Sequence, residues 1–192
     1  MSRLATRLVA VLAPVALLLP VAAQAEKVVT EDPSGDVVVA VSDEGDETAP
    51  SDYAGVDVVR TVVAHGDTAL RLRVHFRALA RDPFQITVAR IRTPQGHYDV
   101  AVERLGGRPV ASFSGPRVAE CPALRAKVDL RADLVTAWLP TACLGTPRWV
   151  KVGVGAVGVD GELEVASAYA DDAHRVGEIR DRIAFGPKVR RG

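Results

Sequence analysis

The feature that most restricts the fold of this chain is a strict alternation of apolar and polar side chains between Thr68 and Arg77. The apolar set is Leu70, Leu72, Val74 and Phe76, and the polar set, here called the basic stripe, is Arg71, Arg73, His75 and Arg77. Successive side chains of a β-strand point to opposite faces, so this period of two predicts a strand with one buried and one solvated face.

Similar short apolar runs recur along the chain and are separated by residues that favour turns. The runs include 37–41, 56–65, 84–92, 124–130, 135–139 and 149–159. Turn residues follow them about every 8 to 12 residues, which is typical of an antiparallel sandwich or barrel. We therefore predict a mainly β protein, a single antiparallel, jelly-roll-like β-sandwich of about nine strands. From Asp171 onward we expect only a brief helical turn or an irregular tail.

The first 25 residues carry the pattern of a secretory signal peptide. Arg3 and Arg7 precede an apolar run over residues 8–21, and small residues for cleavage follow at Ala23-Gln24-Ala25. A membrane-spanning helix needs about 17 to 25 apolar residues, and this run is at the short end of that range. We predict cleavage after Ala25, a secreted or extracellular protein without a transmembrane anchor, and one domain over residues 26–192.

The charge of the remaining chain is unevenly distributed. Residues 26–57 contain ten acidic residues and one basic residue, a net charge of −9, whereas residues 58–192 contain 21 basic and 14 acidic residues, a net charge of +7. An asymmetry of this size within one domain requires a structural or functional reason.

One hypothesis for the acidic segment 26–57 is a calcium site. Calcium takes oxygen ligands from carboxylates in turns, and a secreted protein meets enough calcium to fill a weak site. The candidate ligands are Asp32, Asp36, Asp43, Asp46 and Asp57, although their spacing does not match the EF-hand pattern. Asp171 and Asp172 would contribute if the two parts of the chain met. The other hypothesis is a solvated acidic arm that lies against the basic stripe or stays mobile.

The basic stripe and the tryptophans also allow two interpretations. Exposed arginines at this period usually form the wet face of a half-solvated sheet, and the alternative is a surface for anionic glycans, wall polymers or nucleic acid. The interleaved aromatic residues of a nucleic-acid groove are missing, so we expect no nucleic-acid partner. We expect Trp138 and Trp149 to pack in the core or at a sheet edge rather than to stack on a sugar.

Cys121 and Cys143 lie symmetrically about residue 132, where we expect a hairpin turn between 124–130 and 135–139. Cβ atoms of antiparallel partners are about 4.5 to 5.5 Å apart, and a local adjustment brings them to disulfide distance. A catalytic or metal-binding pair is the alternative, but the spacing is far from Cys-x-x-Cys and no histidine is nearby. In an oxidising compartment we therefore predict a structural disulfide.

No catalytic motif is evident in the sequence. The histidines form no zinc-binding pattern, and no serine lies in a Gly-x-Ser-x-Gly setting. We therefore predict that the protein is not an enzyme.

Several short motifs follow one another in a familiar order. They are Asp32 to Asp36 (Asp-x-x-x-Asp), Asp57 to Val59 (Asp-Val-Val), the alternating strand, and Leu139 to Gly145 before Trp149-Val150. This order resembles uncharacterised secreted bacterial β-sandwich proteins and, more distantly, is similar to carbohydrate-binding module family 9 and DOMON-like domains. The resemblance implies a sandwich that binds a sugar, a haem or no known ligand, with calcium common in the carbohydrate-binding group.

Together these features predict a secreted, non-catalytic binding or interaction module that is glycan-binding and calcium-stabilised. Its expected partner is an extracellular glycan or protein. The alternatives are a structural, envelope-associated β domain without a small ligand and an extracellular hydrolase whose catalytic residues are not recognisable.

Overall fold

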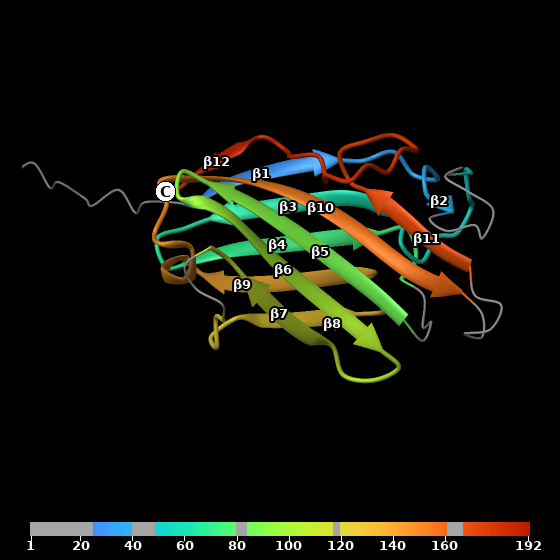
Figure 1. Ribbon diagram of the computed structural model, residues 1–192, viewed down its shortest axis with the longest axis horizontal. Helices are drawn as coiled ribbons and strands as arrows, with labels where there is room; N and C mark the ends of the chain where they lie inside the picture. Colours follow the sequence, from blue (N-terminus) through green and yellow to red (C-terminus); the bar gives the residue numbers. More distant parts are fainter. Residues whose placement is uncertain (1–24, 40–48, 80–83, 117–119, 161–166) are drawn as a thin grey trace, which may run out of the picture.

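The computed structural model describes residues 25–39, 49–79, 84–116, 120–160 and 167–192. The predicted signal peptide, apart from Ala25, and the candidate ligands Asp43 and Asp46 lie outside the described residues. Within the described part, twelve strands and one short 3₁₀-helix form two antiparallel sheets that pack together (Figure 1), which confirms the predicted β-sandwich. None of the helical structure seen there is long and apolar enough to span a membrane.

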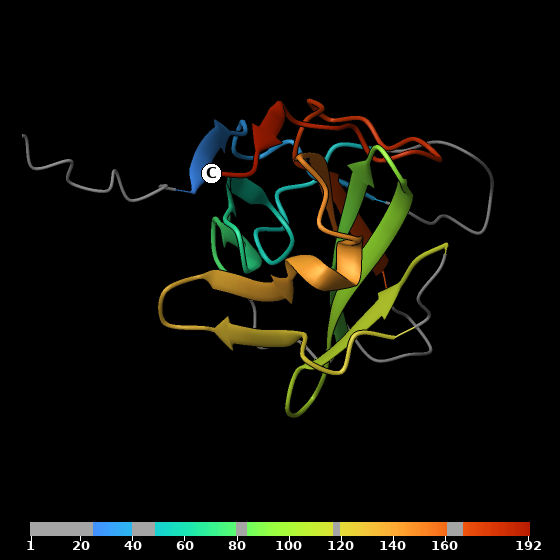
Figure 2. The same cartoon turned by 90° about the vertical axis from the view of Figure 1, so that its left-hand side faces the viewer.

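The two layers of the sandwich are a five-stranded and a seven-stranded sheet. The first has the order β1 (Glu26–Glu31), β3 (Val58–His65), β4 (Ala69–Phe76), β9 (Leu134–Pro140) and β8 (Arg125–Asp129). The second has the order β2 (Val38–Val39), β11 (Ser167–Asp172), β10 (Trp149–Asp160), β5 (Phe84–Thr93), β6 (Gly96–Leu105) and β7 (Val110–Ser114), with β12 (Lys188–Arg190) beside one part of β10. Figure 2 shows the β8 and β9 hairpin in gold in one layer and β5, β6 and β7 in green in the other.

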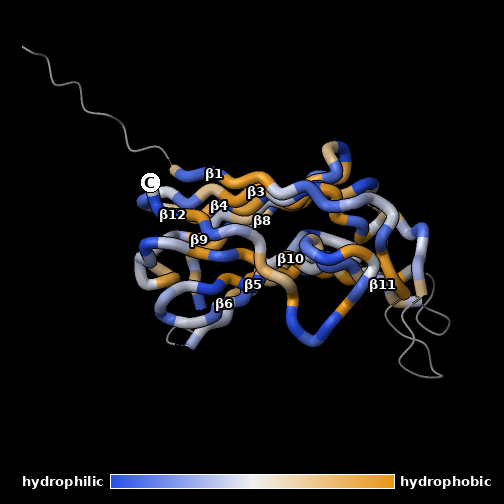
Figure 3. Tube along the Cα trace, turned by 90° about the horizontal axis from the view of Figure 1, so that it is seen from above, coloured by the Kyte–Doolittle hydropathy of each residue, from blue (hydrophilic) through white to orange (hydrophobic). Residues whose placement is uncertain are grey.

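The alternation in the sequence builds the core between these sheets. In β4, Leu70 and Leu72 are buried, whereas Arg71 is exposed. The two leucines lie across the core from Ile91 of β5 and Val152 of β10. Figure 3 shows the resulting mixture of hydrophobic and hydrophilic residues along the strands. Each sheet therefore has one apolar face toward its partner and one polar outer face.

Two strands differ from the expectation for the ends of the domain. β1 pairs with β3, with Glu26 opposite His65 and Glu31 opposite Arg60, so the interpretation of this stretch as part of a solvated or mobile arm is wrong. Its charged residues are compatible with a strand because β1 is at the sheet edge, where charge is tolerated. β12 adds a further strand, with Val189 buried, where only a helical turn or irregular tail was expected.

The predicted disulfide between Cys121 and Cys143 is confirmed, with Cα atoms 5.9 Å apart. β8 and β9 form the predicted hairpin, in which Arg125 is opposite Trp138. The cysteines lie just beyond its strands. Cys121 is in the connection from β7 to β8, and Cys143 is in the 3₁₀-helix η1 (Thr141–Leu144), which leads from β9 to β10. The bond therefore ties together two connections that pass between the sheets.

The segment between β11 and β12 lies against the outer face of the seven-stranded sheet. Gly153 of β10 permits this contact, because a Cβ atom there would lie 2.3 Å from the carbonyl oxygen of Ala184. The backbone N–H of Gly186 donates to the carbonyl oxygen of Val152 at 2.9 Å. A glycine in this strand is thus explained by the close approach of a second backbone.

Candidate cation site

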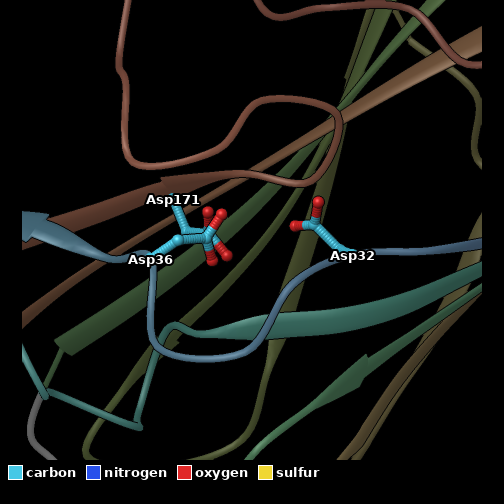
Figure 4. A group of neighbouring side chains, drawn as sticks. All are labelled: Asp32, Asp36 and Asp171. Atoms are coloured by element: carbon cyan, nitrogen blue, oxygen red, sulfur yellow. The ribbon is translucent and has the colours of Figure 1, made fainter.

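Three aspartates from two distant parts of the sequence meet at the connection between β1 and β2. Asp32 and Asp36 belong to that connection, and Asp171 belongs to β11 (Figure 4). One carboxylate oxygen from each residue lies within 4.8 Å of the others. We call Asp32, Asp36 and Asp171 the aspartate cluster.

The β1 to β2 connection is held in place by hydrogen bonds to β3 and to Asp57, the residue before β3. Asp32 N–H donates to the carbonyl oxygen of Val59 at 3.0 Å, and Gly35 N–H donates to Oδ2 of Asp57 at 2.7 Å. Gly35 has a φ of +84°, a left-handed conformation that glycine adopts without strain. The tight turn between Asp32 and Asp36 therefore points both carboxylates toward the same region.

Asp57 packs directly against this turn and is fully buried, with 0% of its surface exposed. Its Oδ2 atom accepts the bond from Gly35 and also forms an ion pair with Nε of Arg77 at 2.8 Å. Its Oδ1 atom is buried and accepts no hydrogen bond from the described residues. Asp57 thus brings one satisfied and one unsatisfied oxygen to the edge of the aspartate cluster.

Asp171 reaches the cluster from the other sheet. It is 3% exposed, and its Oδ2 atom accepts a hydrogen bond of 2.7 Å from the backbone N–H of Val58. β11 pairs with β2 such that Ala170 is opposite Val38, which brings Asp171 level with the residue after Asp36. The cluster therefore joins strands of both layers of the sandwich.

The neighbouring Asp172 has a different role. Its Oδ2 atom accepts hydrogen bonds from Nη1 of Arg175 at 2.7 Å and from the backbone N–H of Ala184 at 2.9 Å. Because these contacts use its carboxylate to hold the segment before β12, we assign Asp172 to structure rather than to the cluster.

Buried oxygens without partners are the most informative feature of the site. Among the described residues, Asp32 Oδ2, Asp36 Oδ1 and Asp57 Oδ1 are buried and have no hydrogen-bond partner. Leaving one buried acceptor unsatisfied costs about 1 to 3 kcal/mol, and more when the group is charged. Two of these oxygens belong to the aspartate cluster, and the third belongs to Asp57, which packs against the same turn. Their lack of donors indicates that a positively charged species or protons belong at the cluster.

The pKa values of the cluster also indicate that protons or a cation are needed there. Burial and, next, the Asp171 carboxylate raise the pKa of Asp32 to about 8. Burial also raises the pKa of Asp171 to about 7, although the hydrogen bond from Val58 lowers it, and burial is the main reason why the pKa of Asp36 is raised. The carboxyl groups oppose one another's ionisation, so at neutral pH protons or a cation must neutralise part of their charge.

The donor set suits calcium. Two oxygens that both bind a calcium ion at about 2.4 Å lie at most about 4.8 Å apart, a limit that the three cluster oxygens satisfy. The cluster offers only carboxylate oxygens, and no cysteine or histidine joins it among the described residues. Zinc favours nitrogen and sulfur ligands, whereas calcium takes oxygen ligands in flexible arrangements that include water.

The structure thus assembles three of the five predicted ligands in one region. Asp32 and Asp36 form the cluster and Asp57 adjoins it, whereas Asp43 and Asp46 lie outside the described residues. Asp171, which the sequence offered only on the condition that distant segments meet, belongs to the centre of the site. For Asp32, Asp36 and Asp57, the interpretation as part of a solvated acidic arm is wrong, because their carboxylates have buried oxygens.

The other predicted features lie elsewhere on the sandwich. Arg71 and Arg73 are on the outer face of the five-stranded sheet, as the basic stripe predicts, while Arg77 turns toward Asp57. Neither tryptophan belongs to the core: Trp138 is half-buried on that outer face, and the Nζ atom of Lys188 lies 4.8 Å from the ring centroid of Trp149.

Comparisons with protein-family models, curated proteins and solved structures find no match to this chain. The likeness to carbohydrate-binding module family 9 and DOMON-like domains therefore remains an expectation. What the chain binds has to be inferred from its own residues.

Proposed function

We propose that this protein is a secreted, non-catalytic binding domain whose sandwich is completed by a calcium ion. The ion is held by Asp32, Asp36 and Asp171, with Asp57 beside them. The observation that carries the proposal is that Asp32 and Asp36, which meet Asp171 where the two sheets join, each have a buried oxygen to which no described residue donates. The neighbouring Asp57 has a third such oxygen. The signal-peptide pattern and the disulfide support an oxidising, extracellular location, where calcium is abundant.

A cation explains the site better than shared protons alone. Protons would neutralise the cluster only where the pH is below the raised pKa values of about 8 for Asp32 and about 7 for Asp171. A calcium ion would neutralise it at any extracellular pH and would bind oxygens to which no described residue donates. It would also connect the β1 to β2 connection with β11, and so stabilise the contact between the sheets.

Calcium titration of the purified, chelator-treated protein tests this proposal. At about 100 times its dissociation constant, calcium should raise the free energy of unfolding by about 2.7 kcal/mol. For a domain of this size, this corresponds to a rise in melting temperature of about 5 to 10 °C. Calorimetric titration should detect saturable binding, and magnesium, which demands a smaller octahedral site, should give a smaller effect.

Asp36→Asn provides the matched test, since it removes one charge and replaces a carboxylate ligand by a weaker, neutral amide oxygen with little change in size. Without calcium this variant should melt at a higher temperature than the natural protein near about pH 8, because it relieves repulsion within the cluster. It should also lose most of the stabilisation by calcium. Asp67→Asn is the control, because the Asp67 side chain is 69% exposed and lies outside the cluster. A natural protein that neither binds calcium nor gains stability from it contradicts the proposal.

A further inference from the structure

The outer face of the five-stranded sheet brings a tryptophan and several cations into register. Trp138 of β9 is opposite Arg71 of β4 on one side and Arg125 of β8 on the other. In the next row, Thr136 lies between Arg73 and Lys127. β4 ends at Phe76, whereas the β8 and β9 hairpin begins at Arg125. The sheet order β4, β9, β8 therefore makes side chains of β4 neighbours of that hairpin.

A shallow pocket of about 340 Å³ lies over these rows. Its lining includes Arg71, Arg73, Lys127, Asp129, Thr136 and Trp138. Thr136 is only 8% exposed although it belongs to the outer face, because longer side chains surround it. The pocket therefore has a floor near Thr136, an indole wall and a cationic rim.

Two cations of this pocket are available to a ligand. Lys127 pairs with Asp129, with Nζ and Oδ2 2.8 Å apart. Arg71 and Arg73 form no ion pair and no side-chain hydrogen bond within the described part of the chain. Arg77 of the same stripe differs, since Asp57 neutralises it. The pocket thus presents two unpaired guanidinium groups beside the half-buried Trp138.

We infer that this pocket binds an acidic polysaccharide. The flat indole of Trp138 offers an apolar surface to the C–H face of a sugar ring, and its edge remains in contact with water. Guanidinium groups bind carboxylates or sulfates through paired, charge-assisted hydrogen bonds, so Arg71 and Arg73 match acidic groups on the sugar or on its neighbour. The pocket shares no residue with the aspartate cluster, so either site can fail without the other.

A nucleic acid or a protein partner fits this pocket less well than an acidic polysaccharide does. Single-stranded nucleic acid binds to grooves in which several aromatic side chains stack on successive bases, whereas Trp138 is the one aromatic residue that the described part of the chain contributes to the lining. A protein partner covers about 800 Å² per side with an apolar centre, whereas this pocket is small and has a charged rim. A sugar ring with an acidic substituent matches both the size and the chemistry.

Binding of defined polymers tests the inference. Oligogalacturonate supplies carboxylates, dextran sulfate supplies sulfates, unmodified dextran is the neutral control and oligo-dT is the polyanion without sugar acids. We expect the galacturonate or sulfated polymer to bind at least about tenfold more tightly than dextran and oligo-dT, a difference of about 1.4 kcal/mol. Each titration is run with calcium and with chelator, which separates this site from the cation site.

Variants show whether binding uses the pocket. Trp138→Ala and the double variant Arg71→Gln with Arg73→Gln should each weaken binding by at least about tenfold. Arg92→Gln, an exposed arginine on a strand of the other sheet, should leave it unchanged. Fluorescence in a Trp149→Phe background reports on Trp138 alone and should shift on binding. Absence of binding to both acidic polymers, equal binding to oligo-dT, or full binding by Trp138→Ala would overturn the inference.

Discussion

The disulfide and the aspartate cluster both hold together segments that connect the two sheets, but they do so by different chemistry. We call these two places the junctions of the sandwich. At one, Cys121 and Cys143 join the connection from β7 to β8 with the connection from β9 to β10. At the other, Asp32 and Asp36 of the β1 to β2 connection meet Asp171 of β11, with Asp57 at the start of β3. In both places, segments that pass between the sheets are brought together.

The difference lies in what each junction needs from its surroundings. The disulfide is a covalent link and is complete once it is oxidised. The aspartate junction brings like charges into a buried space and leaves carboxylate oxygens without partners, so it is complete only when protons or a cation neutralise it. The first should therefore stabilise the fold regardless of pH and calcium, and the second only under suitable conditions.

The largest effect should come from removing the covalent junction. The double variant Cys121→Ser with Cys143→Ser opens a loop with a sequence separation of 22 residues, which should cost about 3 kcal/mol of the free energy of unfolding. Denaturant unfolding measures this loss. Because the junctions share no residue, the stabilisation by calcium should be the same in this variant as in the natural protein. If calcium no longer stabilises the variant, the two junctions are not independent.

A smaller effect should come from Arg77→Gln at the aspartate junction. This change removes the cation that pairs with the fully buried Asp57, and an unpaired buried carboxylate is costly. Since Arg77 is itself one-third exposed, we expect a loss of about 2 kcal/mol rather than the full value for a buried pair. The gain from calcium should increase, because the site has become more negative.

Arg73→Gln is the matched control for that experiment. Arg73 lies on β4, which ends just before Arg77, and has no ion pair among the described residues, so its loss should change stability by no more than about 0.5 kcal/mol. Equal stability of the Arg77→Gln and Arg73→Gln variants would show that Asp57 does not need its partner.

Local patterns were sufficient to predict much of the fold. The alternation in β4 depends on neighbouring residues only, and the hairpin with its disulfide follows from symmetry about a single turn. β1 escaped prediction because its charged residues belong to the acidic segment 26–57, and its strand character depends on pairing with β3. Trp138 was expected in the core or at an edge because it alternates with core residues, but that alternation places it on the outer face.

The candidate site was less predictable from the sequence because it also depends on pairing between distant strands. Asp32, Asp36 and Asp57 are close in the sequence, and a single acidic segment suggested them together. Asp171 is more than 110 residues away, and its place depends on the pairing of β11 with the two-residue strand β2. The Trp138 pocket likewise requires the distant strand β4 to pair with the β8 and β9 hairpin. Long-range register of this kind is not encoded in any local pattern.

The most direct test of the account is the melting temperature with and without calcium across about pH 6.5 to about 8.5. Asp32 and Asp171 have pKa values of about 8 and about 7, above the ordinary 3.8, so the calcium-free folded state binds more protons than the unfolded state in this range. Its stability should therefore fall as the pH rises. His65, His75 and His174, whose burial lowers their pKa values below 6.5, oppose this trend at the low end of the range, where the unfolded histidines still bind protons.

Calcium should remove that decline, because the ion stabilises the ionised carboxylates and its binding strengthens as they lose protons. The difference between the calcium-bound and calcium-free melting temperatures should widen steadily with pH, and Asp36→Asn should abolish most of it. A difference that is zero at every pH, or that is constant across the range, would contradict the calcium proposal.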